Sequence, residues 1–82
     1  MLEKTSIPLA LVHVPVKRRQ SFDAAKAAAL AESILEEGMR VPIRVRPDGD
    51  RFVLVEGLHR LEACRSLGEE TIVCVVAQAR VR

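Results

Sequence analysis

The residues with the clearest chemical meaning stand together at positions 55–60, which read Val-Glu-Gly-Leu-His-Arg. The change of periodicity at Gly57 predicts a strand that turns directly into a helix. A helix start offers unpaired backbone N–H groups and a partial positive charge, which together stabilise an anion. His59 and Arg60 add two side-chain donors in the first turn, and a guanidinium matches phosphate geometry. The segment therefore predicts a phosphate site.

The same segment has a plainer interpretation. Arg60 could pair with an acid such as Glu56, and His59 could be a surface residue without a task, because strand-glycine-helix junctions with a basic residue are common. Glu56 also has two interpretations. It could act as a general base if a substrate hydroxyl lay near the bound phosphate, or it could cap the following helix, which is the commoner arrangement. Residue types alone leave these alternatives open.

Lys26 and Ser33 form a second pair of chemically suggestive residues. They are seven positions apart, hence on one line of a helix, at the edge of its apolar stripe. There a Lys ammonium could contact a polyphosphate while a Ser hydroxyl bonds a ribose or phosphate oxygen. Solvated Lys and Ser side chains at a stripe border are more frequent, so the pair decides nothing alone.

The helix that carries Lys26 is the clearest element. Asp23, preceded by Phe22, is expected to be the N-cap, and Gly38 supplies a left-handed stop. The apolar residues between them recur at the spacing of an amphipathic helix, namely Ala27, Leu30, Ala31, Ile34 and Leu35.

The remaining patterns predict four strands and a second helix. Turn residues Pro47 to Asp50 join two of the strands into a hairpin. The second helix follows Gly57 and ends at Gly68. The nearly unbroken β-branched run 71–76 is typical of a strand covered on both faces. The sum is an α+β fold, a small mixed sheet with two principal helices. The expected strands are Leu9–Val14, Ile43–Arg46, Arg51–Val55 and Thr71–Val76.

Basic residues collect in two places. A predicted loop carries Lys17, Arg18 and Arg19, and a second group is Arg40, Arg44 and Arg46. Alternate spacing puts Arg44 and Arg46 on one strand face, which could meet a polyanion. The alternative is a soluble edge strand that charge protects from aggregation. The residues proposed for nucleic-acid contact are Lys17, Arg18, Arg44 and Arg46.

Composition limits the classes of protein. The chain of 82 residues is 49% hydrophobic and 29% charged, which fits one folded domain, 1–82, rather than a disordered tail. Aromatic residues make up 2%, which argues against base-stacking platforms, and the net charge of +2 is a mild excess. No apolar run approaches the roughly 20 residues of a membrane helix, so a cytoplasmic location without membrane contact is expected.

Cys64 and Cys74 lack ligand spacing and are expected to be reduced core thiols, with no metal site.

On these residues the chain resembles the ParB/sulfiredoxin superfamily from about Ile7 to Ala79. The stretch 15–23, Pro-Val-Lys-Arg-Arg-Gln-Ser-Phe-Asp, is similar to the Pro-x-Gln-Pro-Arg-x-x-Phe-Asp region of ParB N-terminal domains, with Arg19 on the Arg of that region. Residues 57–63 resemble the Gly-Glu-Arg-Arg-x-Arg-Ala phosphate motif of the same domains. Gly, the Arg at position 60 and Ala agree, whereas Leu replaces Glu at position 58, and His and Glu replace Arg at positions 59 and 62.

The sulfiredoxin side of the superfamily is similar to this chain in Gly-Leu-His-Arg and in Glu70-Thr71-Ile72. It also implies an ATP-binding Lys and hydroxyl residue at Lys26 and Ser33. The catalytic Cys of that family falls on Leu58, so the resemblance implies a nucleotide site without the reductase activity. In related free-serine kinases an acid precedes Gly-x-His-Arg, the place that Glu56 holds.

The resemblance implies a nucleotide-binding regulatory or partition-related module of a bacterial or plasmid protein. The expected cofactor is a nucleoside triphosphate, ATP or CTP, with Mg²⁺. The alternatives are a phosphotransferase, NTPase or nuclease-like enzyme with Glu56 as base, and a protein-interaction domain with an emptied site.

The expected partners are nucleotide, DNA or a DNA-binding protein, and a second copy in a homodimer. ParB proteins continue into a helix-turn-helix domain, whereas this chain ends at Arg82, so site-specific DNA reading by it is not expected. The expected nucleotide ligands are Gly57, His59, Arg60, Lys26, Ser33 and Arg19.

Overall fold

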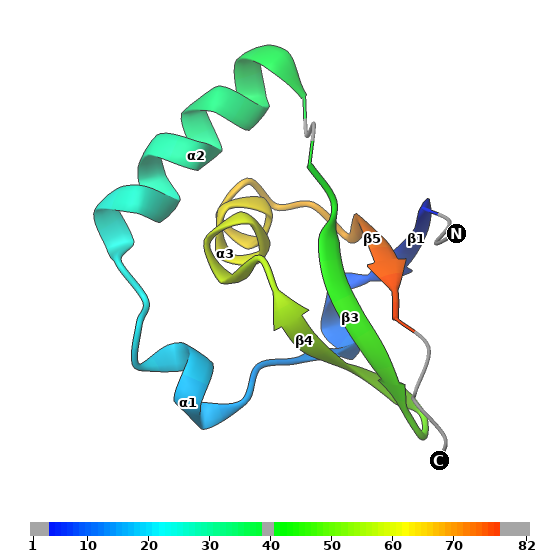
Figure 1. Cartoon of the computed structure of the whole chain (residues 1–82). Coiled ribbons are helices and arrows are strands. Elements are labelled where there is room, and N and C mark those ends of the chain that lie inside the picture. The colour runs from blue at the N-terminus through cyan, green and yellow to red at the C-terminus, as the bar shows by residue number, and fades with distance from the viewer. Residues whose placement is uncertain (1–3, 39–40, 78–82) are drawn as a thin grey trace.

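The computed structural model describes residues 4–38 and 41–77. The strands are β1 (Lys4–Pro8), β2 (Val12–His13), β3 (Ile43–Asp48), β4 (Arg51–Glu56) and β5 (Thr71–Val76), and the helices are α1 (Val16–Arg19), α2 (Ala24–Glu37) and α3 (Leu58–Ser66). Within these residues the strands form one mixed sheet in the order β1-β5-β3-β4-β2. Figure 1 shows α3 between the strands and α2. The predicted α+β fold with two principal helices is confirmed.

The N-terminal strand prediction, Leu9–Val14, is wrong in its bounds. Leu9–Leu11 form a 3-10 turn, β1 precedes it and β2 follows it. β1 pairs antiparallel with β5, and β2 pairs parallel with β4, so the turn joins the two opposite edges of the sheet. A flat sheet would separate those edges by roughly 19 Å, four strand spacings. The chain from Pro8 to Val12 spans at most roughly 14 Å. The sheet must therefore curl around its core.

The predicted basic loop at 17–19 is a short helix, α1. Pro15 precedes its first turn, and the N–H of Arg18 donates to the Pro15 carbonyl at 3.0 Å. Proline has no N–H to lose and suits a helix start, which explains why the chain turns helical immediately after it.

α2 begins where the sequence predicts. The Asp23 carboxylate accepts from the N–H groups of Ala25 at 2.9 Å and Lys26 at 3.3 Å, and Gly38 ends the helix with a φ of 81°. Its apolar face is covered less than predicted. Ala27 is buried, whereas Leu35 remains 75% exposed. The reason is that α2 packs mainly on α3 and not on the sheet.

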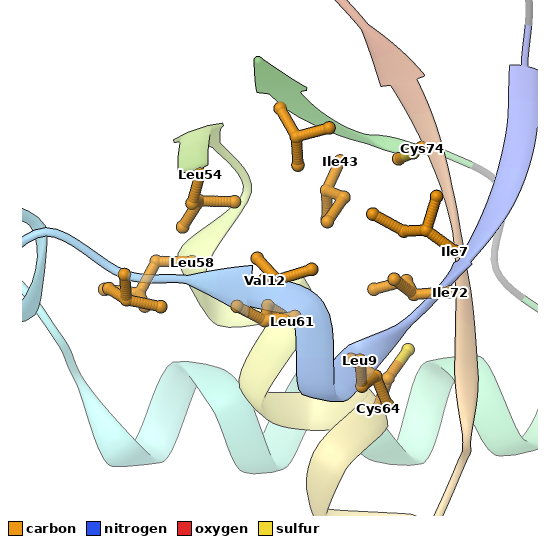
Figure 2. Close-up of a cluster of buried hydrophobic side chains, with 12 residues drawn as sticks. Ile7, Leu9, Val12, Ile43, Leu54, Leu58, Leu61, Cys64, Ile72 and Cys74 are labelled. Atoms are coloured by element: carbon orange, nitrogen blue, oxygen red, sulfur yellow. The ribbon is translucent and has the colours of Figure 1, made fainter. Parts of the chain in front are cut away.

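The core lies between α3 and the inner face of the sheet (Figure 2). Leu61 from α3 and Leu54, Ile43 and Cys74 from the strands are almost fully buried. Cys64 is buried in the same cluster, and neither cysteine forms a disulfide, so the prediction of core thiols is confirmed.

The prediction that β5 is covered on both faces is wrong. Ile72 and Cys74 are buried, but Thr71 is exposed and Val73 is 36% exposed. Valine and threonine suit a half-exposed strand as well as a buried one, so composition cannot separate the two cases. In β3 the alternation holds as predicted: Ile43 and Val45 are buried and Arg44 and Arg46 are exposed.

Candidate phosphate-binding site

The junction between β4 and α3 is built as the sequence predicts. Gly57 is the N-cap of α3, with a φ of 110°, and the N–H of Leu61 closes the first turn on the Gly57 carbonyl at 2.9 Å. The N–H groups of the first three helical residues have no acceptor within the helix. No side chain of the described residues caps them, so the interpretation of Glu56 as the helix cap is not borne out.

Gly57 is also required by the packing of the sheet. A β-carbon at this position would stand 2.7 Å from Cγ2 and 3.2 Å from Cα of Ile43 in β3. The left-handed φ and this close neighbour each favour glycine. The missing β-carbon of Gly57 therefore allows Ile43 of the neighbouring strand to approach closely.

A cleft of about 420 Å³ lies between α2 and the start of α3. It brings together four of the six predicted nucleotide ligands: Lys26 from α2, Gly57 at the N-cap of α3, and His59 and Arg60 from α3. Among the described residues, two cations and no carboxylate line it. Sequence reasoning missed three further lining residues, Ala29 and Leu30 of α2 and Leu58 of α3. The two residues of α2 follow Lys26 at i+3 and i+4, so helical periodicity could have found them.

His59 makes two specific contacts with the segment before α2. Its Nε2 accepts a hydrogen bond from the backbone N–H of Asp23 at 2.9 Å. Its ring stacks on Phe22, with centroids 5.6 Å apart and planes 12° from parallel. The interpretation of His59 as a surface residue without a task is wrong, because the side chain ties the first turn of α3 to the N-cap of α2.

The Arg60 guanidinium has no hydrogen bond or ion pair with the described residues, and its alternative pairing with Glu56 does not form. Arg60 is half-buried and lines two clefts. The second cleft, of about 230 Å³, also holds Gly57, Glu56 and Arg44. Glu56 and Arg44 are paired across β4 and β3. The predicted base therefore lies beside the predicted phosphate site.

Two predicted ligands lie elsewhere. Arg19 lines a third cleft of about 580 Å³ together with Phe22, Glu62 and Arg65. Leu58 lines both this cleft and the one between α2 and α3. Ser33 is exposed and lines none of these three clefts.

The predicted nucleic-acid contacts are split between two elements. Lys17 and Arg18 belong to α1, whereas Arg44 and Arg46 belong to β3, and all four are exposed. Arg40 lies outside the described residues. Among residues 4–38 and 41–77, no group of three or more His, Cys, Asp or Glu side chains could hold a metal ion. No helix in the same ranges has the length and apolarity needed to cross a bilayer.

The sequence matches the model of the ParB N-terminal domain over residues 3–82. The chain belongs to the ParB N-terminal domain family. It is 36% identical over 63 residues to a probable chromosome-partitioning protein ParB of Campylobacter jejuni, a match that covers 77% of this chain and 23% of that protein. It is 36% identical over 70 residues to the chloroplastic/mitochondrial sulfiredoxin of Arabidopsis thaliana, covering 85% and 56%. This ParB N-terminal domain thus spans less than two thirds of these relatives.

Solved structures confirm the resemblance of the fold to both branches of the superfamily. Sulfiredoxin from Arabidopsis thaliana superposes with a TM-score of 0.83 at 32% identity, covering 94% of this chain and 86% of that one. A C-terminally truncated ParB from Caulobacter crescentus complexed with CTP-γ-S gives 0.82 at 26% identity, covering 95% and 46%. A free serine kinase variant in complex with AMP gives 0.78 at 22% identity, covering 93% and 31%, and shares the fold.

Proposed function

We propose that this domain binds a nucleotide through its phosphate groups in the cleft between α2 and α3, and acts as a regulatory or partition-related module. The observation that carries the proposal is the convergence of Lys26 and Arg60 with the uncapped start of α3 on one cleft, which no carboxylate of residues 4–38 and 41–77 lines. A phosphate placed there would meet a partial positive charge, two cations and backbone donors together.

Arg60 would be the main ligand. Its guanidinium is not occupied by a carboxylate within the described residues, so a phosphate would not have to displace an ion pair. A volume of about 420 Å³ falls in the ordinary range of small-molecule sites. The solved ParB from Caulobacter crescentus holds CTP-γ-S, which supports a nucleoside triphosphate as the ligand class. Mg²⁺ would enter with the phosphates, which are its usual ligands in such sites.

The test is isothermal titration calorimetry with ATP, CTP and GTP in the presence of Mg²⁺. We expect binding of at least one nucleotide and its loss in Arg60→Ala, because removing a charge-assisted ligand costs about 1.5–3 kcal/mol, roughly ten-fold or more in affinity. The matched control is Arg51→Ala. Arg51 pairs with Asp48 in the hairpin and lines none of the three clefts. The control substitution therefore removes the same charge at a position away from the site. Equal binding by Arg60→Ala and the parent would place the nucleotide elsewhere.

A second candidate function is phosphotransfer. The adjoining cleft, with Glu56 and Arg44, shares Gly57 and Arg60 with the proposed phosphate site. A hydroxyl substrate in that cleft would lie between a carboxylate base and the bound phosphate, the arrangement that phosphoryl transfer needs. Reduction of a sulfinic acid is not part of the proposal, because position 58 carries Leu and not a thiol.

Contact with DNA is a third proposal, through Lys17, Arg18, Arg44 and Arg46. The ParB from Caulobacter crescentus has also been solved with its centromeric parS site, and this chain covers 40% of that structure at 27% identity. Cations that contact phosphates release counterions, so binding to a duplex should weaken steeply with salt. An affinity that does not change with salt, or that survives Arg44→Ala/Arg46→Ala, would exclude contact through β3.

A further inference from the structure

We propose that the backbone N–H of Asp23 fixes the tautomer of His59, so that Nδ1–H is the atom that donates to a phosphate in the α2–α3 cleft. The inference rests on the proposed function above.

The assignment follows from the direction of one hydrogen bond. A backbone N–H can only donate, so the Nε2 atom that receives it at 2.9 Å must present a lone pair. A neutral imidazole carries one proton, which is then on Nδ1. Nε2 is occupied by Asp23 and has no proton to give. A donor to phosphate on this ring is therefore Nδ1–H.

The Nδ1 atom is open to a ligand. It has no hydrogen-bond partner among the described residues, and within those residues no buried side-chain nitrogen or oxygen lacks a partner. Nδ1 is therefore not enclosed. His59 lines the same cleft as Lys26 and Arg60, so a histidine with an unoccupied ring nitrogen and two cations border one space.

Asp23 links His59 to Lys26. Its N–H holds the ring of His59, while its carboxylate holds the N–H of Lys26 at 3.3 Å. Phe22, stacked at 12° to the His59 ring, fixes the plane in which Nδ1–H points. Because both hydrogen bonds meet at Asp23, the His59 ring on α3 and the backbone of Lys26 on α2 are held relative to each other before any ligand arrives. Asp23 is thus a positioning residue for the site.

The first test is a long-range ¹H–¹⁵N correlation spectrum of the ligand-free domain at neutral pH. We expect His59 to show a protonated Nδ1 and an unprotonated Nε2. His13, the other histidine of the chain, is exposed, and its ring has no hydrogen bond to the described residues, so it serves as the internal reference for an unconstrained ring. A His59 ring protonated mainly at Nε2, or the same tautomer mixture as His13, would overturn the assignment.

The second test is titration with inorganic pyrophosphate, followed in the same spectra. We expect the His59 Nδ1–H signal to move together with the backbone amides of Gly57 and Arg60. His59→Phe, which retains a ring against Phe22 but offers no nitrogen, should bind about ten-fold more weakly. Arg51→Ala is the control and should bind as the parent does.

The outcomes separate the inference from the function on which it rests. Movement of the Gly57 and Arg60 amides with an unmoved His59 ring, or unchanged affinity in His59→Phe, would overturn the donor role and leave the phosphate site. If no amide of the cleft responds to pyrophosphate or to any nucleotide, the proposed function fails and the donor role fails with it.

Discussion

A β-carbon added to Gly57 would lie 2.7 Å from Cγ2 of Ile43, so the start of α3 and the first residue of β3 touch at a point where only glycine fits. This contact sets the direction in which the uncapped end of α3 faces. The same glycine that positions the candidate phosphate site therefore also closes the core.

Gly57→Ala should destabilise the domain strongly. A non-glycine residue in this backbone region costs roughly 1–3 kcal/mol, and crowding against Ile43 adds roughly 1–3 kcal/mol. Urea denaturation followed by circular dichroism measures the sum. Gly49→Ala is the matched control, because Gly49 has a φ of 62° but no atom of the described residues within 4 Å of an added β-carbon. Equal losses in the two variants would mean that Ile43 yields and that only the backbone angle matters.

Asp23→Ala should cost about 1 kcal/mol of stability through the lost cap of α2. Asp23→Asn should retain most of the parent stability, since an amide oxygen can accept the same two N–H bonds from Ala25 and Lys26. Both variants retain the backbone N–H that holds His59. Thermal unfolding of the three proteins measures the difference, and no loss in Asp23→Ala would show that the cap contributes nothing.

Stability should fall at alkaline pH because of the two buried thiols. Burial, with a smaller contribution from the charge of Glu69, raises the pKa of Cys64 above its ordinary value of 9.0, and burial raises the pKa of Cys74. The unfolded chain loses these protons first, so it binds fewer protons than the folded one as the pH rises. The stabilisation is complete below about pH 9 and is lost as the pH rises through the folded-state pKa.

The measurement is the free energy of unfolding in urea, in buffers from neutral pH to about pH 10.5. The double variant Cys64→Ala/Cys74→Ala, compared with its own value at neutral pH, should lose less stability over the same interval. If the free energy of unfolding falls as steeply at alkaline pH in the double variant as in the parent, titratable groups other than the two thiols cause the effect.

Glu56→Gln separates a binding module from a phosphotransferase. The variant keeps the size of the side chain and removes the carboxylate that lies with Arg44 and Arg60 in the smaller cleft. The nucleotide affinity of the variant should stay within about two-fold of the parent value, whether the domain is a binding module or a phosphotransferase. If the domain transfers phosphate to a hydroxyl, turnover should fall by about 10²-fold or more, as for loss of a general base. Turnover that is unchanged in Glu56→Gln would remove Glu56 from the chemistry.

Local signals in the sequence were sufficient for the elements whose ends are marked by particular residues. Asp23 and Gly38 bound α2, and Gly57 separates β4 from α3, because capping and left-handed geometry depend on single residues. β1 was not predicted. Of its five residues only Ile7 is buried, so no alternation signals a strand, and its conformation depends on pairing with β5 at the other end of the sequence.

Local signals in the sequence likewise predicted only part of the candidate site. The position of Arg60 and Lys26 on the cleft follows from a helix start and from helical periodicity. Ser33 lies on the same line of α2 as Lys26 but roughly 10 Å further along it, and periodicity does not say how far a cleft extends. The bond between Asp23 and His59 joins residues 36 positions apart, so only the packing of α2 on α3 could reveal it.

The three-residue turn Leu9–Leu11 couples the two edge strands of the sheet, β1 and β2, to each other. Because the connection is so short, neither edge strand can separate from the sheet without displacing the other. Amide exchange in β2 should accordingly follow that in β1, despite the three strands between them, and a nick within Leu9–Leu11 should uncouple the two rates.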